Sequence, residues 1–279
     1  MARIVCVGDN DVDCYLSDGR MYPGGNCFNV SVFARRSGVG SAYIGAVGDD
    51  AAGRLIRKAL ESEGVDSSRL RVVKGDTAHC VIGHSGGDRQ FVSYDLGVSR
   101  FEPDEEDLQF IASHDAAHVY QHAGLDNCLG AIAARTRLSY DFSTRREASH
   151  RAEVAPRCWL ASFSGAGQSR EETIGLVGAM HATGAKWVLA TRGSEGALLS
   201  GENTLHEVAA APASVVDTLG AGDSFIARVL VGLLRNETPK ALLQAAAQDA
   251  ARACEYFGAV GYGAPSTAWL QSSGGSLQT

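Results

Sequence analysis

Short apolar runs alternate with segments of helical periodicity along most of this 279-residue chain. The strand-like runs cover residues 3–8, 42–45, 116–120, 138–142, 158–161 and 187–191, and the helix-like segments cover residues 25–37, 51–63, 125–135 and 171–182. Such alternation predicts an α/β fold in which a mostly parallel sheet carries helices on both faces. Ligands of these sheets bind outside the carboxyl ends of the strands, so we expect the functional side chains along that edge.

Two regions break this alternation and predict a small accessory β-sheet. Residues 12–16, 21–22, 78–84 and 90–94 resemble short strands, and Asp18-Gly19 and Ser85-Gly86-Gly87-Asp88 suit the turns between them. We interpret them as a lid, drawn from about residues 11–23 and 77–100, that covers a site and excludes water. Hairpins that decorate a rigid core are the alternative. Because strand edges need a partner or a cover, a homodimer through this lid is a further hypothesis.

The rest of the helical pattern lies near the C-terminus. Apolar residues recur at three- to four-residue spacing after Gly222, and a second such run covers residues 239–257. We expect one domain over residues 1–270 and a flexible, Ser- and Gly-rich tail over residues 271–279.

Charge and cysteine usage limit the partners. The formal charge of −7 is spread without a like-charge block, which argues against nucleic acid and membranes and favours a small neutral or cationic ligand. Seven cysteines without a C-x-x-C pair argue against a disulfide framework and a tight zinc site. The first apolar run reaches Asp9 too early for a signal peptide, and no uncharged apolar stretch approaches the roughly 18 residues of a membrane span. We therefore expect a cytoplasmic protein.

A glycine-rich segment precedes the first of the two C-terminal helices. Gly220, Ala221 and Gly222 place free backbone N–H groups at a helix start, where the positive end of the helix dipole favours a phosphate oxyanion. Asp223 follows at once, and a carboxylate there is able to accept the proton of a hydroxyl that attacks a phosphoryl group. Ordinary helix capping is the alternative interpretation. A dinucleotide fingerprint is disfavoured because Phe225 stands where its third glycine belongs, and the chain has no Gly-Lys pair of a Walker sequence.

A second glycine pair lies early in the chain. Gly24 and Gly25 lead into a predicted helix, and Asn26 and Asn29, one turn apart, offer amides suited to sugar hydroxyls. Further polar candidates for substrate binding, all with ordinary loop or strand-surface alternatives, are Asp9, Asn10 and Asp13 after the first strand, His122 after a central strand, and Arg89 on an accessory strand. The G-x-S-x-G match at residues 83–87 lies between two strand-like runs, which favours a hairpin turn over a nucleophile elbow.

The two glycine segments together are similar to the two signatures of the ribokinase-like (PfkB) carbohydrate kinase family. The likeness rests on Gly24-Gly25-Asn26 with Asn29 and on Asp217-Thr218-Leu219-Gly220-Ala221-Gly222-Asp223, and it extends to residues 8–13, 47–53 and 191–196. It implies a three-layer α/β/α fold with a mostly parallel central sheet and a small β lid. It also implies transfer of the γ-phosphoryl group of ATP to a primary hydroxyl of a sugar.

The resemblance implies roles for individual residues. Asp223 would be the general base, and the backbone of residues 220–222 would hold the charge that develops on the phosphoryl group. The residues implied at the ATP site are Thr191, Gly193, Gly196, Gly220 and Gly222, and those on the sugar side are Asp9, Asp13, Gly25 and Asn29. Mg²⁺ would accompany the nucleotide, and K⁺ near Asp217 and the turn at residues 262–264 is a further implication.

The sequence departs from the family pattern at one motif, which in the family helps to hold the metal. Many family members carry Asn-x-x-Glu where this chain reads Ala161-Ser162-Phe163-Ser164-Gly165, so the Mg²⁺ ligands are not identified. Glu171 or Glu172, at the start of the next helix, are alternative carboxylates.

The sequence constrains the identity of the acceptor substrate least. Residues 8–13 and 22–26 and the Ile-Ala pair after Phe225 are most similar to fructoselysine 6-kinases, which implies fructoselysine as acceptor and its 6-phosphate as product. The same signatures serve fructokinases, 2-keto-3-deoxygluconate kinases and nucleoside kinases. A non-catalytic sugar- or nucleotide-binding regulator is the alternative from another class.

Overall fold

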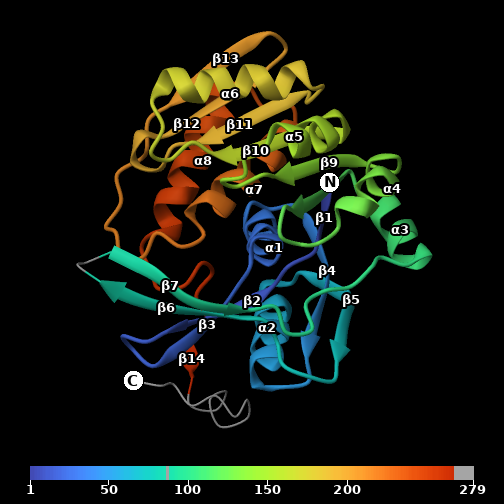
Figure 1. Ribbon diagram of the computed structural model, residues 1–279, viewed down its shortest axis with the longest axis vertical. Helices are drawn as coiled ribbons and strands as arrows, with labels where there is room; N and C mark the ends of the chain where they lie inside the picture. The colour runs from blue at the N-terminus through green and yellow to red at the C-terminus, as the bar shows by residue number, and fades with distance from the viewer. Residues whose placement is uncertain (86–87, 267–279) are drawn as a thin grey trace.

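The computed structural model describes residues 1–85 and 88–266, and its centre is a nine-stranded sheet (Figure 1). The strand order is β13-β12-β11-β10-β9-β8-β1-β4-β5, and all neighbours are parallel except β11 with β12 and β12 with β13. The strands are β1 Arg3–Val7, β4 Gly40–Gly48, β5 Asp66–Val73, β8 Ala116–Tyr120, β9 Arg137–Asp141, β10 Cys158–Ser164, β11 Trp187–Thr191, β12 Ala197–Gly201 and β13 Thr204–Val208.

Helices cover both faces of this sheet, because the central strands are apolar on both sides. In β1, Ile4 and Cys6 belong to one buried cluster, and Val5 and Val7 belong to the other. The first cluster includes α1 Asn26–Arg36, α2 Ala51–Glu63, α7 Ala221–Leu234 and α8 Pro239–Ala253; the second includes α3 Glu105–Ala112, α4 Leu129–Ala133, α5 Ala148–Val154 and α6 Arg170–Ala182. The predicted three-layer α/β/α fold is confirmed.

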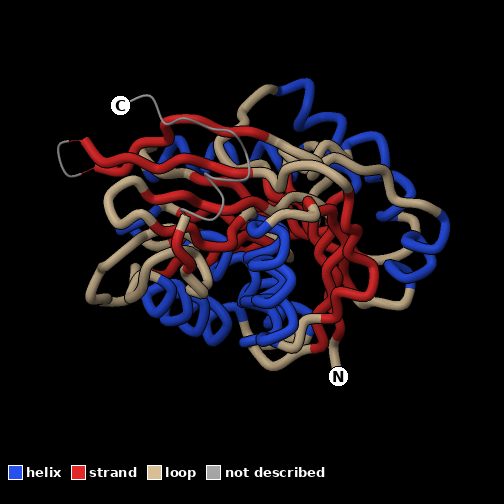
Figure 2. Tube along the Cα trace, turned by 90° about the horizontal axis from the view of Figure 1, so that it is seen from below, coloured by secondary structure: helices blue, strands red, loops and turns tan. Residues whose placement is uncertain are grey.

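A second sheet lies apart from the first and appears as a separate layer of strands in Figure 2. Its order is β14-β3-β2-β6-β7, with β2 Asp11–Tyr15, β3 Arg20–Gly24, β6 His79–Ser85, β7 Asp88–Asp95 and β14 Ala264–Pro265. We call this sheet the lid. Strands β6 and β7 pair antiparallel as far as Ser85 and Asp88, so residues 83–85 of the G-x-S-x-G match lie on a strand, while Gly86 and Gly87 lie outside the described residues. Strand β7 is an edge strand, which is the feature that the predicted homodimer would cover; the homodimer stays a prediction.

One helix differs from its prediction. The segment at residues 125–135 forms a 3₁₀ turn, Asp126–Cys128, followed by the five-residue α4. The last turn tightens, with Arg135 N donating to the Ile132 carbonyl at 3.0 Å, because the chain must reverse into β9 at once.

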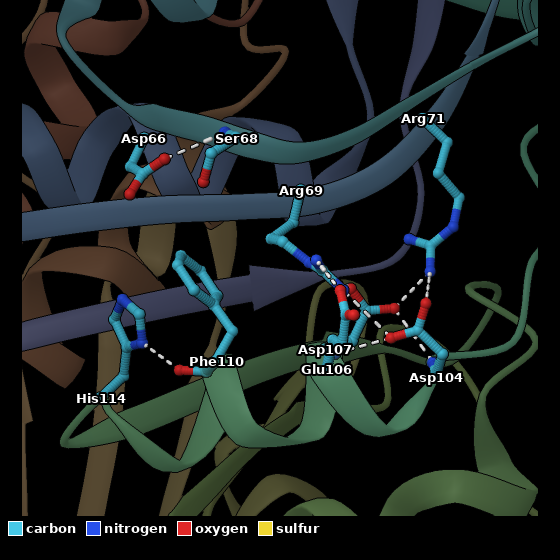
Figure 3. Close-up of polar contacts among 9 residues, drawn as sticks. All are labelled: Asp66, Ser68, Arg69, Arg71, Asp104, Glu106, Asp107, Phe110 and His114. Atoms are coloured by element: carbon cyan, nitrogen blue, oxygen red, sulfur yellow. Dashed lines mark hydrogen bonds and ion pairs between the residues drawn. The ribbon is translucent and has the colours of Figure 1, made fainter.

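Edge strand β5 is held by charges from α3 (Figure 3). Arg69 Nε donates to Asp107 Oδ1 at 2.9 Å and Arg69 Nη2 donates to Asp104 Oδ1 at 3.0 Å, while Arg71 also pairs with the fully buried Asp107. Asp104 and Asp107 form the capping box that begins α3. Burial alone would raise the pKa of Asp107, but the hydrogen bonds from Arg71, the Asp104 backbone and Arg69 outweigh it and hold the pKa below its usual value.

Within the described ranges, no helix has both the length and the apolar character needed to cross a membrane. The predicted tail at residues 271–279 lies outside the described residues.

Candidate functional site

An acid–amide cluster joins the starts of α1 and α7 at the carboxyl-end edge of the main sheet. Asn26 Nδ2 donates to Asp223 Oδ1 at 2.8 Å and to Asp141 Oδ2 at 3.0 Å. Asn29 Nδ2 donates to the other oxygen of Asp223, Oδ2, at 2.7 Å. The two glycine segments, about 190 residues apart in the chain, therefore meet at one carboxylate.

The backbone at the start of α1 aims Asn26 into this cluster. Gly25 is the N-cap with φ 97°, and a Cβ there would come within 2.6 Å of Asn10 Cα, so glycine is required. Asp9 Oδ2 accepts from Asn26 N at 2.7 Å and Asp9 Oδ1 accepts from Cys27 N at 3.2 Å. Asp9 thus caps α1 although it lies well before the helix in the chain, and burial raises the pKa of Asp9.

The start of α7 has the geometry of an anion site. Gly220 is the N-cap with φ 77°, it makes no side-chain cap, and a Cβ there would lie 2.5 Å from Ala259 Cβ. The first N–H groups of a helix have no intrahelical acceptor. A Cβ on Gly222 would meet nothing within 4 Å, so an oxyanion has room beside this turn.

Asp223 has the proton affinity expected of a base that works near neutral pH. The pKa of Asp223 is raised to about 7: burial is the largest cause, the charges of Asp141 and Asp9 add to the rise, and the hydrogen bonds from Asn29 and Asn26 oppose it. The side chain is only partly buried, so an incoming hydroxyl has access to it.

A buried histidine fixes the orientation of Asn26. His118 Nε2 lies 2.9 Å from Asn26 Oδ1, and His118 Nδ1 lies 2.9 Å from Ser139 Oγ. Because an amide oxygen only accepts, the proton is on Nε2, and the amide nitrogen is left to face Asp141 and Asp223. Burial lowers the pKa of His118 to about 3, so the ring is neutral and His118 acts as a positioning residue.

Asp141 is the main residue that the sequence analysis missed. It ends β9, accepts from Ser162 Oγ at 3.1 Å and from Ser143 N at 3.0 Å, and has a pKa raised by burial to about 6. A carboxylate at the carboxyl end of a predicted parallel strand was the available signal.

The lid brings two more carboxylates near the cluster. Burial raises the pKa of Asp11, and the charges of Asp13, Asp9 and Asp223 raise it further. Gly24 faces these side chains across the β2–β3 pair, and a Cβ there would lie 2.2 Å from Asp13 Oδ2 and 2.8 Å from Asp11 Oδ1. Glycine at 24 therefore leaves the space that both carboxylates occupy.

The roles of three other predicted substrate-binding residues, Asn10, His122 and Arg89, stay predictions. Asn10 is fully buried, and its amide donates to Tyr43 Oη and to the Ala46 carbonyl, both at 2.9 Å. His122 is exposed on the rim of a cleft that follows β8. Arg89 belongs to β7, but its side chain lies outside the described part of the structure.

The predicted nucleotide-side residues follow β11, two strands from β9 on the same edge. Thr191 ends β11, and Gly193 begins a 3₁₀ turn with φ 59° and open space at its Cβ position. Gly196 closes the turn with φ 88°, and a Cβ there would come within 1.9 Å of the Val208 carbonyl. Glycine at position 196 is therefore required for the backbone conformation of this turn.

The predicted cation residue, Asp217, connects the lid to the segment before α7. Its Oδ2 accepts from Tyr15 Oη and from Gly258 N, the latter at 3.0 Å, and its Oδ1 accepts from Leu219 N at 3.0 Å. Glu172 is engaged in the capping box of α6 with Ser169. Across the described residues, no group of three or more His, Cys, Asp or Glu side chains is arranged to hold a metal ion.

Comparison with known proteins decides the family. The sequence pattern of the pfkB family carbohydrate kinases matches residues 1–139 and 158–266. The chain belongs to this family. It is 37% identical to fructosamine kinase FrlD of Bacillus subtilis over 99% of both chains, and 34% identical to fructoselysine 6-kinase of Escherichia coli over 93% of this chain and 100% of that one. An Arabidopsis thaliana ribokinase solved with ribose and ATP has the same fold, with a TM-score of 0.83, 22% identity and coverage of 97% and 98%.

As a carbohydrate kinase of this family, the chain is a phosphotransferase with an alcohol group as acceptor. The family membership predicted from the two glycine segments is confirmed.

Proposed function

We propose that this kinase transfers the γ-phosphoryl group of ATP to the primary hydroxyl of a sugar linked to an amine, with fructoselysine 6-phosphate as the product from fructoselysine. The observation that carries the chemistry is Asp223, a carboxylate with a pKa of about 7 in the first turn of an uncapped helix. The observation that favours a sugar–amine acceptor is the near full-length likeness to a fructosamine kinase and a fructoselysine kinase.

The proposed reaction is a direct in-line displacement. Asp223 accepts the proton of the acceptor hydroxyl as its oxygen attacks the γ-phosphorus, and the bond to the oxygen that bridges the β- and γ-phosphorus atoms breaks, which releases ADP. The N–H groups of residues 220–222 stabilise the equatorial oxygens, because the helix dipole and donors face the developing negative charge. Asn26 and Asn29 hold the carboxylate in place before and after proton transfer.

The residues present fit a nucleotide-borne Mg²⁺. Mg²⁺ commonly binds through phosphate oxygens and water with one or two protein carboxylates, and it would neutralise charge on the phosphates here. Asp141 and Asp223 are carboxylates beside the proposed phosphoryl position. A K⁺ ion at Asp217 remains part of the proposal; it would share a carboxylate that already accepts from Tyr15 and Gly258. Comparison of turnover in KCl and NaCl tests that part.

The test measures ADP release with ATP, Mg²⁺ and a panel of fructoselysine, fructose, 2-keto-3-deoxygluconate and nucleosides. We expect fructoselysine to have the highest kcat/KM. Preference for fructose would select the alternative that a 29% identical Salmonella typhimurium fructokinase represents. Absence of turnover throughout would favour a non-catalytic binding regulator.

Asp223→Asn tests the base directly. We expect kcat to fall by at least about 100-fold with little change in acceptor binding, because the amide cannot take the proton. Near-normal turnover would remove this role from Asp223.

A further inference from the structure

A polar cleft of about 750 Å³ opens beside the acid–amide cluster and has no role in the chemistry above. It is formed by the two loops that follow β8 and β9. Its lining residues are Gln121, His122, Thr144, Arg145, Arg146 and Glu147.

Hydrogen bonds connect the wall of this cleft to Asp223. Tyr120 and Asp141 are paired at the ends of β8 and β9, and Gln121 N donates to the Asp141 carbonyl at 3.0 Å. The carboxylate of Asp141 accepts from Asn26, which also holds Asp223. Two hydrogen-bonded residues, Asn26 and Asp141, therefore separate the wall of this cleft from Asp223, where the acceptor hydroxyl is proposed to lie.

Gln121 supplies an unused acceptor in the cleft wall. The residue is only 7% exposed, and its Oε1 has no hydrogen-bond partner. Buried polar atoms without a partner are rare, because they lose their bonds to water without replacement. The atom is itself inaccessible, so a rotation of the Gln121 side chain would be needed to bring it into the cleft, where a ligand that donates a hydrogen bond, such as an ammonium group, would satisfy it.

Arg146 supplies a fixed positive charge. Its guanidinium donates to the Ser143 carbonyl at 3.1 Å, to the Arg145 carbonyl at 3.4 Å and to the Ser164 carbonyl, and it lies 5.3 Å from the centre of the Phe163 ring. These contacts orient the group. The charge of Asp141 acts on it through space, but no carboxylate forms an ion pair with Arg146 among the residues that the structure describes.

Arg145 differs from its neighbour because its charge is already balanced. Arg145 Nε lies 3.3 Å from Glu147 Oε2, and Arg145 Nη1 lies 3.8 Å from Asp126 Oδ2. Glu147 is exposed on the rim of the cleft, where its carboxylate also faces solvent. The cleft thus offers one cation that forms no ion pair within the described residues, Arg146, and two residues with acceptor oxygens, Gln121 and Glu147.

We propose that this cleft binds the amino-acid part of the sugar–amine acceptor. Arg146 pairs with the α-carboxylate, and Gln121 Oε1 and Glu147 accept hydrogen bonds from ammonium groups. This inference rests on the proposed function and adds to it the groups that select an amino-acid conjugate over the free sugar. A zwitterion matches the cleft better than a simple anion, because the lining holds both the basic Arg145 and Arg146 and the acidic Glu147.

The test compares two acceptors that differ only in the carboxylate: fructoselysine and the fructose conjugate of 1,5-diaminopentane. We expect wild-type kcat/KM to favour fructoselysine by about 10- to 100-fold, the range of one charge-assisted hydrogen-bonded pair. Arg146→Ala should reduce this ratio to near one, and Arg146→Lys should retain part of it. The ratio within each variant is independent of the fraction of folded enzyme.

Two further variants sharpen the experiment. Gln121→Leu should raise KM for both amine-bearing acceptors, with little effect on fructose. Arg54→Ala is the matched control, because Arg54 is an exposed arginine on α2 that donates to the Asp49 carbonyl, and it should leave the acceptor ratio unchanged.

The outcomes separate this inference from the proposed function. Equal kcat/KM for the two conjugates in the wild type, or an unchanged preference in Arg146→Ala, would overturn the cleft assignment while the kinase assignment stands. No turnover with either conjugate would overturn the sugar–amine function and the cleft assignment together.

Discussion

Asn29 offers a direct way to perturb the basicity of Asp223. Its Nδ2 donates to Asp223 Oδ2 at 2.7 Å, its side chain is 3% exposed, and its own Oδ1 has no partner. Asn29→Leu keeps the shape of the side chain, removes the donor and also removes the unpaired acceptor. Because the lost hydrogen bond stabilises the charged carboxylate, the pKa of Asp223 should rise.

The size of the shift follows from the strength of that bond. A hydrogen bond to a charged group contributes about 1.5–3 kcal/mol, and one pKa unit corresponds to about 1.4 kcal/mol, so the shift should be about 1–2 units. From a starting pKa of about 7, the new midpoint lies at about 8–9. A general base works when deprotonated, so activity is lost as the pH falls through this pKa. At pH 7, kcat/KM should therefore drop about 5- to 50-fold and recover at high pH.

The assay is the pH profile of kcat/KM from initial rates of ADP release, between about pH 5 and 10. Gln244→Leu is the control, because Gln244 is an exposed amide on α8. We expect the acidic limb to move upward in Asn29→Leu alone. A uniform loss of activity with an unmoved limb would refute the argument, since Asn29 would then act on something other than the ionisation of Asp223.

Three other substitutions test the structural contacts around the site. Asp107→Asn should lower the unfolding free energy by about 1–3 kcal/mol at pH 7, the range of a lost hydrogen bond to a charged group. Because the native pKa of Asp107 is depressed, this difference is present above the ordinary carboxylate pKa and disappears as the pH falls through the native pKa. Equal urea midpoints at pH 7 would contradict it. Gly220→Ala should cost about 1–2 kcal/mol, since φ is 77° and Ala259 is in contact, with a lower melting temperature and a lower kcat. Tyr15→Phe removes the hydroxyl that donates to Asp217 and should lower the melting temperature by a few degrees; an unchanged transition would show that the contact contributes nothing.

The buried strands of the main sheet and the helices that pack on its faces were predictable from sequence. The predicted ranges 51–63 and 116–120 coincide with α2 and β8, because apolar periodicity alone specifies such segments. Strand β5 and helix α3 were not predicted. Most of β5 is exposed or half-buried, and its partners Asp104 and Asp107 lie far along the chain, so no local pattern marks it.

The residues of the candidate site likewise fall into those that the sequence predicted and those that it did not. The glycine segments predicted Asp223, Asn26 and Asn29, because two glycine-led helix starts with polar side chains in their first turns together match the two family signatures. Asp141 and His118 were missed as members of the cluster. Their roles depend on the β8–β9 register and on the entry angle of α1, which bring an isolated aspartate and a core histidine to the same amide.

The two glycine-led helix starts look alike in sequence but differ in charge balance. The N–H groups that open α1 already donate to Asp9, whose carboxylate occupies the place an external anion would take. The start of α7 has no side-chain cap, and Gly222 leaves open space beside it. Because a filled anion site cannot also bind phosphate, we infer that the phosphoryl group binds at α7, while α1 contributes the amides that hold the base. An Asp9→Ala variant should therefore free the start of α1 and displace Asn26, so kcat, measured from ADP release, should fall through the loss of the Asn26 contact to Asp223.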